Sequence, residues 1–387
     1  MVTIAWVIGR RAETEYKDLW QVDWDYLIRG SLYELLRVSI LTDIKSPVLD
    51  EIRKDDDNWK KVNESVLKQL SDKVPDLPEW FADDMHEYLL GHHSTPERSN
   101  AYVILRAASA LATAWEFRLV EHANPFLHDL ADTKASIEAG VRRYQYVPAV
   151  LDIYENRNDL GRFTDLCGRL RFQQRWSQTP IVPSRPVLDH ELMVGYLTYG
   201  CIADGTVECQ TREMWHRYQG FFGAVFHDLS EVLTRDIISP VKDMDDGVIG
   251  QIVKEIERDW FEKLFEPMLP KRLYNELRFF ALEEFKQRTW PPTDWPMYLQ
   301  NQDSNRDGVE HPGPVIHACD KFAAFMEAYY SISFGVHSSS LWGAVSWSDE
   351  AIARRRGYDP KAQVLEPLYE SFQIELKEMA ARVSGSI

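Results

Sequence analysis

Apolar positions recur with helical spacing along nearly the whole chain. The clearest stripes span residues 28–36, 103–115, 215–233 and 315–330, where apolar side chains return every three or four positions. This spacing puts them on one face of a helix. Alternating patterns of four or more residues, which would indicate strands, are scarce. The sequence therefore predicts an all-α protein.

Two proline-rich stretches interrupt the helical pattern. Residues 178–186 contain three prolines and predict an extended connector, because each proline disfavours the α conformation of the residue before it. Residues 290–314 contain five prolines around a polar stretch. A loop of that length within a compact domain is typical of a functional or a disordered segment. We therefore expect an inserted loop at about 286–314.

An internal repeat predicts two related halves. Residues 236–243 (DIISPVKD) match residues 43–50 (DIKSPVLD) at six of eight positions, with an offset of 193. Each copy follows an apolar helical stripe, which favours an ancient duplication over a chance match. With the polar, turn-rich break near residue 160, the repeat predicts one domain over residues 1–160 and a second over 161–387.

Composition and charge narrow the classes of function. The chain has 61 acidic and 44 basic residues and a formal net charge of −17. This sign disfavours a partner that is a nucleic-acid polymer or an anionic membrane surface. No run of 18 apolar residues indicates a membrane span, and no basic region precedes the short apolar run at the N-terminus. The four cysteines are widely spaced and form no C-x-x-C pair, which favours reduced thiols over disulfides or a zinc site. These features predict a cytoplasmic protein.

Two histidines and two aspartates in the second half could bind a metal. Asp320 lies within an apolar helical stripe, where a carboxylate is costly unless it is paired or bound to a metal. Together with His190, His227 and Asp228 it offers mixed nitrogen and oxygen ligands that suit one divalent ion: Mn, Co, Mg, Fe or Zn. Glu231 follows His227 by one helical turn, so it could exchange a proton with an attacking water.

The segment 227–242 (HDLSEVLTRDIISPVK), with Arg175-Trp176 fifteen residues before His190, resembles a known family. It is similar to the HD-domain metal-dependent phosphohydrolases, in particular the bacterial 5′-deoxynucleotidase branch. The resemblance covers about residues 165–340 and implies an HD-domain helical bundle. It assigns the metal to His190, His227, Asp228 and Asp320, and the catalytic carboxylate to Glu231.

The same resemblance implies further contacts with the substrate. Arg175 would hold the phosphate, and Trp176 would crowd the place where a 2′-hydroxyl group would sit. Asp236 would contact the hydroxyl side of the sugar, while Thr234 and Lys242 would shape the pocket. The spacing between the His227-Asp228 pair and Asp320 is longer than in the short bacterial enzymes, largely because of the segment 286–314. This segment could cover the pocket, so the base preference and the number of phosphate groups stay open.

We therefore expect a metal-dependent phosphohydrolase that acts on nucleotides, above all deoxynucleoside 5′-monophosphates. One alternative is a deoxynucleoside triphosphohydrolase or another small phosphoester hydrolase. Few Lys or Arg residues accompany the motifs, which favours a monophosphate. The other alternative is a non-catalytic nucleotide sensor with the HD fold. The intact metal and proton-transfer set argues against it.

Applied to the N-terminal half, the repeat predicts a degenerate, metal-free copy of the HD domain. The aligned positions are Glu34 for His227, Leu35 for Asp228, Val38 for Glu231 and Ala108 for Asp320. We expect this half to pack on the catalytic half as an intramolecular pseudo-dimer, with further homo-oligomerisation left open. A second dipeptide, His128-Asp129, belongs to the degenerate half and is expected to have no catalytic role.

Overall fold

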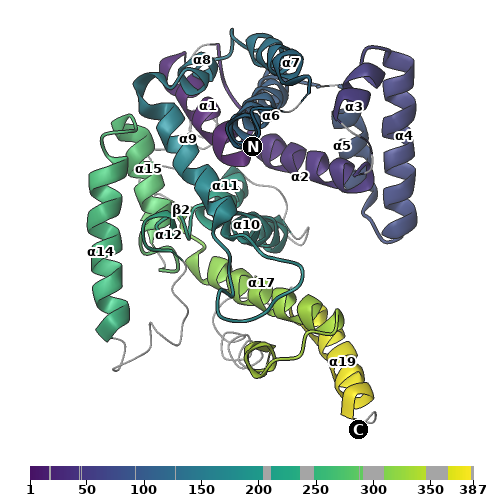
Figure 1. Ribbon diagram of the computed structural model, residues 1–387, viewed down its shortest axis with the longest axis vertical. Helices are drawn as coiled ribbons and strands as arrows, with labels where there is room; N and C mark the ends of the chain where they lie inside the picture. The colour runs from purple at the N-terminus through teal and green to yellow at the C-terminus, as the bar shows by residue number, and fades with distance from the viewer. Residues whose placement is uncertain are drawn as a thin grey trace. The chain divides into compact units, whose positions relative to one another are not determined.

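The structure, a computed structural model, consists of helices grouped into two compact units, Met1–Tyr154 and Glu155–Ile387 (Figure 1). The described residues are 1–16, 19–42, 44, 46–91, 93–126, 128–203, 211–235, 248–286, 288–290, 309–345 and 365–384. The all-α prediction is confirmed. No helix among these residues is long and apolar enough to cross a membrane. The predicted boundary at residue 160 lies six residues beyond the division between the units.

The first unit is built around one long helix, α6. Its helices are α1 (Val2–Glu15), α2 (Trp24–Ile40), α3 (Ser46–Ile52), α4 (Asp56–Lys73), α5 (Glu79–Leu90), α6 (Pro96–Ala123), α7 (Leu130–Arg142) and α8 (Val150–Tyr154). Helices α1, α2, α7 and α8 all contact α6. Helix α2 starts where the Asp23 side chain accepts a hydrogen bond from the backbone N–H of Tyr26, and Thr95 caps α6 in the same way.

Glu34, which the repeat aligns with His227, takes part in ion pairs within the first unit. Glu34 forms an ion pair with Arg37, lies 3.6 Å from Arg106 Nη1, and accepts a hydrogen bond from the Tyr88 hydroxyl group. Leu35 is exposed, as is Val38. The carboxylate at the position aligned with His227 thus already has cationic partners. The duplication itself stays a prediction.

The second unit contains the candidate chemistry. Its helical elements are η1 (Arg157–Asp159), α9 (Leu160–Arg169), η2 (Leu170–Phe172), α10 (Val187–Ala203), α11 (Thr211–Val225), α12 (Glu231–Thr234), α14 (Val248–Phe265), α15 (Lys271–Ala281), α17 (Gly313–Ser333) and α19 (Leu365–Ser384). Helices α10, α11 and α17 contact one another pairwise and form the centre of the unit (Figure 1).

Close packing of α10 against α11 depends on a glycine. A Cβ atom at Gly220 of α11 would lie 2.4 Å from Ile202 Cδ1 and 3.0 Å from Thr198 Cγ2, both on α10. The missing side chain lets the two helices approach closely. Helix α17 packs alongside with a largely buried apolar face, which includes Ile316 and Phe325. These contacts fix the helices that carry the site.

The predicted loop at about 286–314 begins and ends on a small sheet. Strand β1 (Thr289–Trp290) pairs antiparallel with β2 (Val309–Glu310), three residues before α17 begins. Residues 291–308 lie outside the described part of the chain. At the start of α17, a Cβ atom on Gly313 would lie 2.6 Å from the carbonyl carbon of Phe285. Glycine at this position therefore lets α17 start directly against the preceding backbone.

His311, just before α17, predicts a measurable loss of stability in acid. Its Nε2 donates to the Glu284 carbonyl oxygen at 2.9 Å, and burial, with Arg288 nearby, lowers its pKa from 6.5 to about 3. Below pH 6.5 the unfolded chain therefore binds a proton that folded His311 does not, so acid favours unfolding. Between pH 7 and pH 5 this group should remove about 2 kcal/mol from the free energy of unfolding.

Urea denaturation of wild type and His311→Gln at both pH values measures this loss. The glutamine can still donate to Glu284 but does not titrate, so the variant should lose about 2 kcal/mol less on acidification than wild type. His128→Gln is the control, because His128 is 92% exposed at the side chain. Equal losses in wild type and His311→Gln would contradict the prediction.

Candidate metal centre and active site

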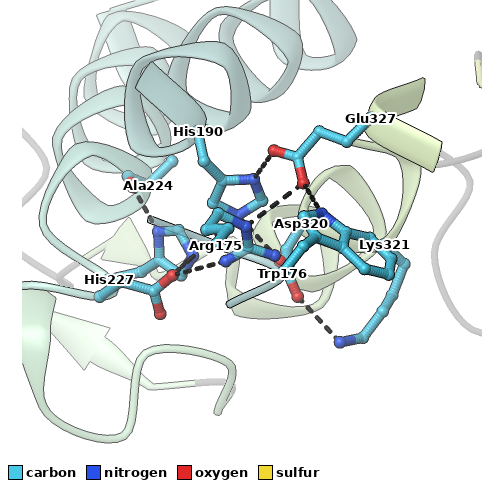
Figure 2. Close-up of polar contacts among 9 residues, drawn as sticks. Arg175, Trp176, His190, Ala224, His227, Asp320, Lys321 and Glu327 are labelled. Atoms are coloured by element: carbon cyan, nitrogen blue, oxygen red, sulfur yellow. Dashed lines mark hydrogen bonds and ion pairs between the residues drawn. The ribbon is translucent and has the colours of Figure 1, made fainter. Parts of the chain in front are cut away.

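The side chains of the candidate site come from four separate segments of the second unit (Figure 2). His190 lies on α10, and His227 and Asp228 lie in the turn that follows α11. Asp320 lies on α17. The segment 173–186, which includes the predicted connector and is called the connector from here on, supplies Arg175. The Arg175 backbone N–H donates to the carbonyl oxygen of Arg185 and so joins the two ends of this segment. The three packed helices thus bring distant parts of the sequence to one place.

His190, His227 and Asp228 form a compact cluster of metal-binding atoms. One ligand atom from each residue lies within 4.8 Å of the other two. His227 Nε2 is 3.1 Å from Asp228 Oδ2, and His190 Nε2 is 4.0 Å from the same oxygen. Both histidines are buried. Among the residues that the structure describes, this is the cluster that could hold a metal ion.

Each imidazole is fixed by a partner on its Nδ1 side (Figure 2). His227 Nδ1 donates to the carbonyl oxygen of Ala224 at 2.6 Å, which leaves Nε2 unprotonated when the ring is neutral. His190 Nδ1 lies 3.0 Å from Glu327 Oε1, so its Nε2 also points into the cluster. Partners of this kind orient the imidazoles of metal-binding histidines.

Asp320 lies at the edge of the cluster. Its Oδ1 is 3.1 Å from His190 Nε2, while its Oδ2 is 3.0 Å from Lys321 Nζ (Figure 2). The structure therefore places Asp320 against His190 and beside Lys321, and its role as a metal ligand stays a prediction.

The electrostatics of the cluster favour a cation. Burial alone would raise the pKa of Asp228, but His227 and Arg175 hold it well below its ordinary value. Burial would lower the pKa of His227, yet Asp228 and Asp320 raise it to about 10. Asp320, too, keeps a pKa well below normal in spite of burial, because Lys321 and His190 stabilise its charged form. Ionised carboxylates therefore surround the two imidazoles.

The donor set fits a divalent metal. The buried Nε2 atoms of His227 and His190 both face Asp228 Oδ2, at 3.1 Å and 4.0 Å. Imidazole nitrogens beside a carboxylate are ligands that divalent metals commonly take. Two imidazole nitrogens and two carboxylates suit Mn, Fe, Co, Ni or Zn, and the carboxylates also suit Mg.

Arg175 and Trp176 approach the cluster from the connector. Arg175 Nη1 is 3.5 Å from Asp228 Oδ2, and its Nε is 3.3 Å from Glu327 Oε2. The Trp176 indole nitrogen donates to the same Glu327 oxygen at 2.8 Å (Figure 2). Trp176 has a φ of 60°, an uncommon conformation for a bulky residue. The predicted pair thus lies beside the cluster.

The predicted helix through His227 and Glu231 is interrupted. Helix α11 ends at Val225, residues 226–230 form turns, and Glu231 starts the short helix α12. The expectation that one helical turn aligns His227 with Glu231 was therefore wrong. Glu231 is nevertheless buried next to the turn that carries His227 and Asp228.

Of the three remaining residues that the resemblance places near the substrate, the structure describes Thr234. The Thr234 hydroxyl donates to Glu257 Oε1 on α14 at 2.7 Å. Asp236 and Lys242 lie outside the described residues. His317, which is three residues before Asp320, stacks on Phe285 at 4.3 Å between ring centroids, and Phe285 lies 6.0 Å from the His227 ring.

Two buried glutamates lie in the site but were not predicted from the sequence. Glu327 contacts His190, Arg175 and Trp176, and it follows Asp320 by seven residues, or about two helical turns. That spacing was a usable signal, since both carboxylates fall on the same face of α17. Glu191 is buried next to His190, and its burial raises the pKa well above the ordinary value. Nothing in the pattern around Glu191 distinguishes it from a surface glutamate.

The second unit contains a region that matches a known protein family. Residues 167–338 match the family model described as HD domain. The chain is 24% identical over 213 residues to a 5′-deoxynucleotidase of Vibrio vulnificus, and 21% identical over 218 residues to one of Vibrio cholerae. Each alignment covers 55% of this chain and 94% of the relative.

A solved structure, an HD-domain phosphohydrolase from Listeria innocua, is similar with a TM-score of 0.43 and 16% sequence identity. The match covers 59% of this chain and 99% of that one. The matched HD domain region includes the elements that carry His190, His227, Asp228 and Asp320.

Proposed function

We propose that this HD-domain phosphohydrolase removes the 5′-phosphate group of a deoxynucleoside monophosphate, using one divalent cation held by His190, His227, Asp228 and Asp320. The observation that carries the proposal is the cluster of His190, His227 and Asp228, whose ligand atoms lie within 4.8 Å of one another beside the Arg175 guanidinium group. The similarity to two 5′-deoxynucleotidases supports the choice of substrate.

The bound cation would polarise the phosphoryl group and make water a stronger nucleophile. Arg175 would bind phosphate oxygens and neutralise their charge, because its Nη1 already reaches Asp228 at the edge of the cluster. Glu231 would accept the proton of the attacking water and pass it to the leaving oxygen. Trp176 would occupy the space next to the sugar, where a 2′-hydroxyl group would collide with the indole ring.

The cations beside the cluster support a substrate with a single phosphate group. Arg175 and Lys321 are in ion-pair contact with the carboxylates of the cluster. Both already face negative charge, so within the described part of the chain these two cations leave little positive charge for a triphosphate. This balance supports a monophosphate and makes a triphosphohydrolase the alternative.

Phosphate release from a panel of nucleotides tests the proposal. Deoxy- and ribonucleoside 5′-mono- and triphosphates are offered with Mn²⁺, Co²⁺ or Mg²⁺, and inorganic phosphate and triphosphate are measured separately. Deoxynucleoside monophosphates should exceed ribonucleoside monophosphates by at least roughly tenfold in kcat/KM, equivalent to about 1.4 kcal/mol. A chelator should abolish release.

The other outcomes contradict the proposal in distinct ways. Release of inorganic triphosphate identifies a triphosphohydrolase. Equal rates with deoxy- and ribonucleotides would contradict the proposal that Trp176 excludes a 2′-hydroxyl group. Binding of metal and nucleotide without turnover identifies a nucleotide sensor.

A further inference from the structure

Glu327 lies on α17 two helical turns beyond Asp320 and points toward the same cluster (Figure 2). Its side chain is 1% exposed, so water does not satisfy its oxygens. A buried carboxylate is costly unless hydrogen-bond donors surround it. Glu327 has three such donors, and all of them belong to residues of the proposed site.

The first oxygen of Glu327 determines which nitrogen of His190 faces the metal. Oε1 lies 3.0 Å from His190 Nδ1. A carboxylate oxygen can only accept, so Nδ1 carries the hydrogen, and the lone pair of neutral His190 lies on Nε2. That nitrogen faces Asp320 and Asp228. Without Glu327, the ring could adopt the other tautomer or rotate.

The second oxygen holds the connector. Oε2 accepts from Trp176 Nε1 at 2.8 Å and from Arg175 Nε at 3.3 Å. The bond to Nε turns the end of the guanidinium group toward Asp228, which Nη1 meets at 3.5 Å. Trp176 has a left-handed backbone conformation, which is unfavourable for a bulky residue, so its surroundings must offset the cost. The indole hydrogen bond is one contact that can do so.

We propose that Glu327 is a positioning residue whose single carboxylate sets both the His190 ligand and the Arg175–Trp176 pair relative to the metal. The inference rests on the metal centre of the proposed function, but not on the identity of the nucleotide. Because one group serves three donors, its loss should weaken metal binding and substrate binding together. No amide can replace it fully, since an amide nitrogen would face a donor.

Metal titration of Glu327→Gln by calorimetry with Mn²⁺ tests the His190 arm. Loss of an outer partner of a metal-binding histidine costs about 10–100-fold in metal affinity, and we expect a fall in this range. Glu276→Gln is the matched control: Glu276 is a fully buried glutamate of the same unit that accepts from the Tyr218 hydroxyl away from the cluster. It should bind Mn²⁺ like wild type.

The results separate the possible failures. If wild type binds none of Mn²⁺, Fe²⁺, Co²⁺, Ni²⁺, Zn²⁺ and Mg²⁺, the proposed function fails. If wild type binds Mn²⁺ and folded Glu327→Gln binds it equally well, the positioning role fails while the proposed function stands. If Glu327→Gln does not fold, the titration is repeated on Glu327→Asp, which keeps the charge but shortens the side chain. Affinity equal to wild type in that variant overturns the proposal.

A double-mutant cycle tests the Arg175 arm. Alone, Glu327→Gln should lower kcat/KM at saturating Mn²⁺, with part of the loss in KM because Arg175 no longer points toward the phosphate. In an Arg175→Ala background the same substitution should cost less than half as much on a logarithmic scale, since residues that act through each other are not additive. Additive effects would show that Glu327 does not act through Arg175.

Discussion

Asp228→Ala should reduce phosphate release by at least about 1000-fold and weaken Mn²⁺ binding in parallel. Asp228 faces both imidazoles of the cluster and Arg175, so its removal takes a negative ligand from the centre. Metal assistance contributes several kcal/mol to the stabilisation of charge in the transition state, and about 4 kcal/mol corresponds to this factor. Calorimetric titration and initial rates measure the two effects.

The chain provides its own control for this substitution. Asp129 forms an ion pair with the adjacent His128 in an exposed His–Asp dipeptide of the first unit. Asp129→Ala should retain wild-type rates and metal affinity within twofold. If Asp228→Ala kept even a tenth of the wild-type rate, the assignment of Asp228 to the metal centre would be wrong.

Glu231→Gln should lower kcat by about 100- to 10,000-fold while leaving Mn²⁺ affinity near the wild-type value. A general acid or base contributes a factor of this size, and glutamine has nearly the same shape but cannot accept the proton. Glu231 is buried at the start of α12, next to the turn that holds His227 and Asp228. The retained metal affinity distinguishes this loss from that of Asp228→Ala.

Glu255→Gln on the exposed face of α14 is the matched control and should leave kcat unchanged. A Glu231→Gln enzyme with more than half of the wild-type kcat would assign proton transfer to another group. Glu191 would then be the next carboxyl group to test, since it is buried beside His190.

The helical fold could be predicted because amphipathic helices repeat their apolar positions over many residues, and tertiary packing uses that repeat. The break after Val225 could not. Residues 226–230 keep the helical spacing of Phe226 and Leu229, yet they form turns that carry His227 and Asp228 into the cluster. Periodicity records which side chains are buried, but it does not show whether the backbone between them remains helical.

The candidate site could be predicted only in part. His190, His227, Asp228 and Asp320 were identified from their residue types and their resemblance to a family, and the structure brings their side chains together. Glu327 was missed because a glutamate on a helix is usually solvated, and its partner Arg175 lies 152 positions away. Only the folded chain shows that this glutamate is buried among donors.

The first unit is compact, but the structure does not test the sequence-based prediction of its origin. Each unit is compact, and at the position aligned with His227 the carboxylate of Glu34 is engaged by Arg37 and Arg106. This engagement gives Glu34 a local structural role. The degenerate HD origin of this unit and the pseudo-dimer stay predictions.

The pairing of β1 with β2 determines how much a change in the length of the segment between the two strands would cost. The chain leaves this point at Trp290 and returns to it at Val309, directly opposite. The entropy of closing a segment between two neighbouring anchor points rises only with the logarithm of its length. A change in the length of this segment should therefore cost little free energy, because the pairing of β1 with β2 fixes both of its ends just before the helix that carries Asp320.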